Sequence, residues 1–133
     1  MKVKTLILIA LILPLLFSCS ENQEEIDLAK KTVDAFYSFE KVSDYKSIDK
    51  LMSTRFYMTT PFFKFKEFLE AKKSMLGSFK GKELESFDIT VSTNSISQVV
   101  LKYKVNYTYK KANESFVLEK NKNNFRILKY SIE

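Results

Sequence analysis

Acid–base chemistry in this chain would depend on carboxylates and tyrosines, because the sequence contains no histidine. That absence removes the usual proton shuttle at neutral pH. It also excludes Ser-His and Cys-His nucleophiles and histidine-bearing zinc sites within the chain. A carboxylate can act as a base near neutral pH when an apolar pocket raises its pKa. A catalytic acid should therefore occupy a core-facing position on a helix or a strand.

Most of the 16 acidic residues fail this test, since they fall on predicted polar faces or in turns. Asp34 lies off the apolar stripe of the first predicted helix, and Glu40 lies at its fringe near the helix end. Glu119 follows Leu118 on a strand with the character of an edge, so we expect its side chain to point outward. Water keeps such carboxylates ionised, and none should titrate above about pH 5.5. We therefore predict no catalytic residue, no metal site and no cofactor.

Three tyrosines are candidates for the rim of a pocket. Tyr37 falls on the apolar stripe of the first predicted helix, and Tyr103 and Tyr107 fall on the apolar face of the longest predicted strand. Each could line the mouth of a ligand pocket, or it could be a large core residue that keeps only its hydroxyl in water. We favour the second interpretation over a catalytic role.

The single cysteine, Cys19, follows a sequence with the features of an export signal. Lys2 and Lys4 are positively charged, and residues 6–17 form an apolar run. That run fits the apolar region of a signal peptide and is shorter than the roughly 20 residues that span a bilayer. One cysteine also excludes an internal disulfide framework. An ordinary secretory signal with an incidental cysteine is the simplest alternative.

The stretch LFSC, residues 16–19, resembles the lipobox of bacterial lipoproteins, although Phe17 departs from the usual residue at its position. The resemblance implies cleavage before Cys19 and attachment of diacylglycerol and a palmitate-type acyl chain to this residue. Two or three acyl chains anchor a protein stably to a membrane. We expect a signal peptide over 1–18, an acylated anchor and short tether over 19–23, and one domain over 24–133. The expected location is the bacterial cell envelope, at the periplasmic or surface face of the outer membrane.

The first half of the domain has the apolar spacing of helices. The pattern predicts a helix over 23–41, followed by a short second helix that Ser43 or Asp44 can cap. Aromatic and branched residues predict a short strand over 55–59. A third helix is predicted within 61–77, because proline is tolerated at a helix start and glycine is a natural stop.

The second half changes to the two-residue period of strands. Residues 87–91 alternate, and the alternation over 99–109 predicts a long antiparallel strand with one buried and one wet face. Further strands are predicted over 115–120 and 125–133, with a possible bulge near Leu128 where the alternation slips. The predicted turns between these strands are residues 110–114 and 121–124.

Helices followed by antiparallel strands predict an α+β fold. We expect the N-terminal helices to pack on a bent antiparallel sheet of four main strands, with the apolar sheet face against the first helix. Val33 and Phe36 of that helix should pack together with Tyr103 and Val105 of the longest strand.

With these elements the chain resembles the NTF2-like (cystatin-like) superfamily, in which helices and a strongly bent sheet form a cone. It looks most like the small exported lipoproteins of uncharacterised function in that superfamily. Enzymes of the superfamily place an acid, often with a tyrosine, inside the cone, but the matching motifs here are structural. The matching stretches are SDYKSIDKLMSTRF (43–56), FLEAKKSMLGSFKGKELESF (68–87) and NFRILKYSIE (124–133).

The expected function is a membrane-anchored envelope lipoprotein with a non-catalytic module that binds a small apolar ligand or docks on an envelope protein. The alternatives are a small enzyme of the isomerase or dehydratase type and an immunity or inhibitor lipoprotein. The net charge of +6 comes from lysines spread along every element, which favours a solvated surface and predicts no nucleic-acid partner.

Overall fold

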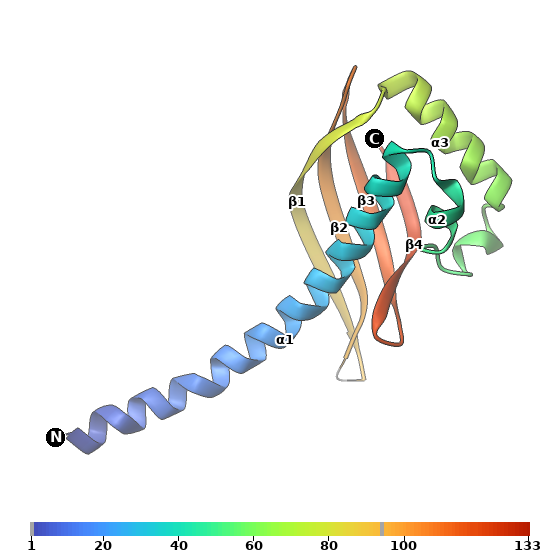
Figure 1. Cartoon of the computed structure of the whole chain (residues 1–133). Coiled ribbons are helices and arrows are strands. Elements are labelled where there is room, and N and C mark those ends of the chain that lie inside the picture. Colours follow the sequence, from blue (N-terminus) through green and yellow to red (C-terminus); the bar gives the residue numbers. More distant parts are fainter. Residues whose placement is uncertain (1, 94) are drawn as a thin grey trace.

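The computed structural model describes the backbone of residues 2–93 and 95–133, and the side chains of residues 22–93 and 97–133. It shows an α+β fold in which helices pack on a bent four-stranded antiparallel sheet with the order β1-β2-β3-β4 (Figure 1). The predicted fold class is thereby confirmed. The elements in chain order are α1 (Lys2–Lys41), α2 (Tyr45–Asp49), the 3₁₀ helix η1 (Phe56–Met58), α3 (Phe62–Leu76), β1 (Phe79–Ser92), β2 (Ser95–Tyr107), β3 (Lys111–Asn121) and β4 (Asn124–Ile132).

α1 buries the apolar stripe that its sequence predicts, and it ends at Lys41 as expected. Its bounds extend N-terminal to the predicted start at residue 23. The predicted signal peptide over 1–18 and the anchor at Cys19 lie outside the residues whose side chains are described, so both stay predictions. After α1, the Asp44 carboxylate caps α2 by accepting a hydrogen bond from the Ser47 amide at 3.2 Å, as the sequence predicts.

The strand predicted over 55–59 is wrong, because this segment forms η1. Its backbone bonds run from an amide to the carbonyl three residues before, as in Met58 to Arg55 at 3.3 Å. Aromatic residues also pack well from a 3₁₀ helix. Phe56 of η1 packs on Phe65 of α3 with ring centroids 4.8 Å apart. Just before this segment, Met52 forms an isolated parallel β-bridge with Ile127 of β4.

The turn predicted over 110–114 is also wrong, because β3 already begins at Lys111. The connection from β2 is tighter than expected and is closed by a 2.9 Å hydrogen bond from the Tyr107 amide to the Lys110 carbonyl. β2 ends at Tyr107 rather than at Tyr109, whose side chain is exposed. The residues assigned to the turn therefore lie within the sheet, where Glu114 pairs with Tyr103 on β2 and Ile132 on β4.

The bulge predicted near Leu128 is confirmed by the register of β3 and β4. Val117 pairs with Lys129 and Leu118 pairs with Ile127, so Leu128 is the extra residue on β4. Ile127 and Leu128 are consecutive and both buried, which strict alternation in a strand would not allow.

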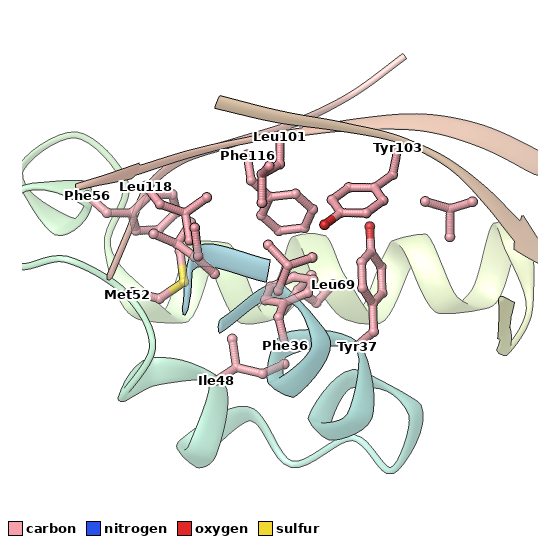
Figure 2. Packing of buried hydrophobic residues seen from close by; sticks show 14 of the residues in the cluster. Phe36, Tyr37, Ile48, Met52, Phe56, Leu69, Leu101, Tyr103, Phe116 and Leu118 are labelled. Carbon is pink, nitrogen blue, oxygen red and sulfur yellow. The ribbon is translucent and has the colours of Figure 1, made fainter. Parts of the chain in front are cut away.

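The core lies between α1 and the concave face of the sheet, with α2 and α3 closing its sides. Figure 2 shows Phe36 and Tyr37 of α1 directed toward Leu101, Tyr103 and Phe116 of the sheet. The Phe36 ring meets the Phe116 ring edge-on, with centroids 5.2 Å apart. Val33, Phe36, Tyr103 and Val105 are buried in one cluster, which confirms the predicted packing of the first helix on the long strand.

Candidate functional site

A buried ionic cluster joins α1, α3 and β3. The Lys72 ammonium of α3 lies 2.8 Å from Glu40 Oε1 of α1 and 2.9 Å from Glu114 Oε1 of β3, and all three side chains are buried. Each residue faces inward by the period of its element. Glu40 follows Phe36 by one helical turn, Lys72 lies between Leu69 and Leu76 on the buried side of α3, and Glu114 alternates with Phe116.

Two tyrosines complete the hydrogen bonding of Glu114. The Tyr107 hydroxyl donates to one carboxylate oxygen and the Tyr130 hydroxyl donates to the other. Lys72 Nζ donates to the Tyr130 oxygen at 2.7 Å and lies 4.9 Å from the centre of the Tyr107 ring. The three N–H donors of Lys72 therefore have partners in Glu40, Glu114 and Tyr130.

The surroundings of Glu40 favour its protonated form. Burial raises the pKa of Glu40, and the nearby Lys72 ammonium offsets this effect only in part. The Glu114 carboxylate also raises the pKa of Glu40, because a second negative charge disfavours ionisation of Glu40. Burial and the neighbouring carboxylates also raise the pKa of Tyr37 and of Tyr107. Both tyrosines therefore stay neutral, and Tyr107 serves as a hydrogen-bond donor to Glu114.

The three candidate tyrosines lie in the core. Tyr37 stacks on Phe79 with ring centroids 4.6 Å apart, and its hydroxyl has no hydrogen-bond partner among the described residues. Tyr107 belongs to the ionic cluster. Tyr103 is buried beneath the Lys82 ammonium, 5.5 Å from its ring centre, and borders a shallow hollow of about 280 Å³ in the sheet.

The acidic residues predicted at the surface have different outcomes. Asp34 is exposed as expected and pairs with Lys82 at 2.6 Å. The surface position predicted for Glu40 is wrong, because α3 covers the end of α1 and brings Lys72 against this carboxylate. Glu119 is half-buried, since its carboxylate accepts hydrogen bonds from Ser53 and Arg55. β3 is an interior strand, so the edge character predicted for it is also wrong.

Sequence reasoning missed Lys72 and Glu114, although a signal was present for each. Lys72 follows Phe65 and Leu69 at helical spacing and precedes Leu76, so it continues the buried side of α3. Glu114 alternates with Ala112 and Phe116 once β3 is allowed to start at Lys111. The preference of charged residues for the surface outweighed both patterns.

A groove of about 400 Å³ lies beside the cluster, between α3 and the connection from β2 to β3. Its walls are largely apolar, and Lys72 is among its lining residues, whereas Glu40 and Glu114 are not. Lys110 and Lys111 stand on its border, and neither makes an ion pair within the part of the chain that the structure describes. The other residues that line the groove are Phe68, Ala71, Met75, Leu76, Ala112, Ile132 and Glu133.

Gly77 fixes the wall of this groove. It ends α3 with φ +86° and ψ −160°, a conformation that is essentially restricted to glycine. A Cβ atom here would lie 2.7 Å from Thr108 Cβ, so the chain passes very close to the β2–β3 connection. Backbone bonds tie the two segments together, from Tyr109 to Leu76 at 2.9 Å and from Thr108 to Ser78 at 3.0 Å. The predicted helix stop at Gly77 is confirmed, and it joins the end of α3, where Leu76 lines the groove, to the β2–β3 connection.

Within residues 22–93 and 97–133, no group of three or more Cys, Asp or Glu side chains is arranged to hold a metal ion. No described helix combines the length and hydropathy that crossing a bilayer would require. The comparisons with known proteins add no relative, since no family model, no curated protein and no solved structure matches this chain.

Proposed function

We propose that this chain is a lipid-anchored protein of the bacterial cell envelope whose domain, built on an NTF2-like plan, binds a small apolar ligand without catalysis. The groove beside α3 carries this proposal. Its volume of about 400 Å³ lies within the range of small-molecule sites, and its walls are predominantly apolar, as in most such sites. Three parts of this proposal rest on the sequence resemblance alone. They are lipidation at Cys19, the outer-membrane location and the NTF2-like relationship.

The border of the groove favours a ligand with an acidic end. Lys110 and Lys111 are exposed and have no carboxylate partner among the described residues, so an anionic group can pair with them at little desolvation cost. The apolar part of the ligand would lie along Met75 and Leu76 of α3. A fatty acid has both features and is a suitable probe.

The test uses the full chain in lipid nanodiscs and the fluorescent fatty acid cis-parinaric acid, with empty nanodiscs as the blank. Ala71→Trp should fill the groove and weaken binding about tenfold or more, which corresponds to at least about 1.4 kcal/mol. Ser74→Trp is the matched control, because Ser74 is exposed on α3 and does not line the groove. Equal affinities of the two variants, or no saturable binding by the natural chain, would exclude the ligand-binding proposal.

A second candidate is a small enzyme of the isomerase or dehydratase type. The observation that favours it is the raised pKa of Glu40, a buried carboxylate in the same ionic cluster as Glu114 and Tyr107. Against it, Glu40 does not line the groove, and the ammonium of Lys72, which does line it, is fully engaged. Carboxyl-carbon NMR titration of the full chain, with and without parinaric acid, distinguishes an enzyme from a non-catalytic binding protein. A Glu40 signal that titrates near pH 7 and shifts with ligand would support the enzyme.

A further inference from the structure

β1 carries apolar residues on the core side of the sheet that are only partly covered: Ile89 is half-buried against the core cluster, whereas Phe87 and Val91 are exposed. Phe87 pairs with Leu101 and Ile89 pairs with Val99, and directly paired residues project from the same face. Leu101 and Val99 are fully buried. Phe87, by contrast, is 54% exposed. Val91 continues the same alternation along β1 and is 59% exposed. We call Phe87, Ile89 and Val91 the edge stripe.

Phe87 and Val91 are exposed because α1 covers β1 less than the other strands it contacts. α1 packs mainly on β4 and β2, and β1 is an edge strand of the sheet. Two exposed apolar side chains on a core-side face, Phe87 and Val91, indicate a contact with something outside the domain.

The edge stripe runs toward the end of the sheet where α1 approaches the predicted anchor. The β1–β2 and β3–β4 connections share this end, because neighbouring strands are antiparallel and Gln98 pairs with Glu119. The Lys120 ammonium pairs with Glu25, which fixes α1 to the same end. Cys19 precedes Glu25 by six residues, so the two lie about 9 Å apart in a helix and at most about 22 Å apart in an extended chain.

We propose that the edge stripe of the anchored protein inserts into the bilayer that holds its acyl chains. This inference rests on the proposed anchoring at Cys19. An anchor so short holds the end of the sheet against the lipid headgroups, where an exposed Phe and Val can bury their side chains at the boundary of the acyl region. The exposed Lys122 in the β3–β4 connection lies at the same end and suits phosphate headgroups.

The structure favours lipid over a second copy of the chain at this edge. Strand-to-strand association would need a flat, regular β1 with free backbone groups. Three register shifts interrupt the pairing of β1 with β2, between Phe79 and Gly81, between Leu84 and Ser86, and between Thr90 and Val91. Such irregularities twist an edge strand away from pairing with another sheet. Insertion into lipid requires only the side chains.

The absence of tryptophan from the chain provides a direct test. Val91→Trp places a single fluorophore in the edge stripe, and Asp88→Trp places one on the opposite face of the same strand. The acylated full chain is reconstituted in vesicles of phosphatidylethanolamine and phosphatidylglycerol, with or without brominated acyl chains. We expect bromine to quench the Val91→Trp emission several-fold more than the Asp88→Trp emission.

The other possible outcomes overturn either the insertion of the edge stripe or the anchor as well. Equal quenching of the two variants, in protein that floats with the vesicles, would overturn the insertion of the edge stripe and leave the anchor intact. Failure to float would overturn the anchor and the inference together. A concentration-dependent blue shift of the Val91→Trp emission without vesicles, and no bromine quenching with them, would assign the stripe to self-association instead.

Discussion

At the scale of single residues, Glu40 has the most informative environment, because its burial and its pairing with Lys72 act in opposite directions. Burial prevails and raises the pKa of Glu40 in the folded protein. The folded state therefore binds this proton more tightly than the unfolded state does. The resulting stability is fully present below the ordinary glutamate pKa and is lost as the pH rises through the raised value.

The raised pKa of Glu40 predicts how the free energy of unfolding depends on pH. From about pH 4.3, the ordinary glutamate value, upward, the natural chain should lose stability relative to Glu40→Gln, because glutamine keeps the volume and stays neutral. Urea unfolding of both proteins at a series of pH values measures the difference. Glu70→Gln is the control, since Glu70 is exposed on α3 and forms only a 3.9 Å pair with Lys66. Parallel curves for Glu40→Gln and the natural chain would contradict the raised pKa.

The sequence predicted the apolar residues of the core better than its buried charges. Position on a helical stripe correctly predicted the burial of Phe36, and exposure was correctly predicted for Asp34. Glu40 and Lys72 were not predicted to be buried, because a charge enters a core only when its partner is present, and that partner comes from another element. Periodicity within one element carries no information about such a partner.

At the scale of elements, local patterns predicted most of the fold. The alternation over 99–109 predicted β2 with its buried face, although the strand ends at Tyr107, and the slip near Leu128 predicted the bulge in β4. The segment over 55–59 was assigned to the wrong element, because its aromatic residues suit a strand and a 3₁₀ helix alike. The start of β3 was missed because Asn and Glu near Lys111 are typical of turns, while cross-strand pairing keeps them in the sheet. The placement of α3 depends on contacts with β2 and β4 that are distant in sequence.

The junction of α3 with the β2–β3 connection gives a prediction at this scale. Gly77→Ala should destabilise the domain by about 1–3 kcal/mol, because its φ of +86° strains any residue with a Cβ and the new methyl group would clash with Thr108. It should also weaken the binding of parinaric acid, since the clash displaces the groove wall. Urea denaturation and the nanodisc titration measure the two effects.

The second glycine of the chain provides a matched control for this prediction. Gly81 lies in β1, has no atom within 4 Å of an added Cβ and does not need a positive φ. Gly81→Ala should therefore leave stability unchanged or raise it slightly, because alanine reduces the conformational entropy of the unfolded chain. If both alanine variants have the same stability, the close packing of Gly77 on Thr108 does not hold α3 in place.

At the scale of the whole molecule, the domain has two different ends. The groove lies near the β2–β3 connection, and the predicted anchor approaches the opposite end, where Glu25 pairs with Lys120. A membrane contact at the second end leaves the groove directed away from the bilayer. Anchoring and ligand binding can then occur together, and the variants that test one should not disturb the other.

The proposed anchor gives the last prediction, because a single sulfur atom would set the location of the whole molecule. Cys19 is the only thiol, so Cys19→Ala removes the only position that could form the thioether link to lipid. Metabolic labelling with radioactive palmitate should label the natural chain and Ser20→Ala but not Cys19→Ala, and Cys19→Ala should shift from the membrane fraction to the soluble fraction. The stability of Cys19→Ala should equal that of the natural chain, since Cys19 precedes the folded core. A natural chain that takes up no palmitate, or a Cys19→Ala variant that still takes it up, would show that the LFSC motif is not a lipid attachment site.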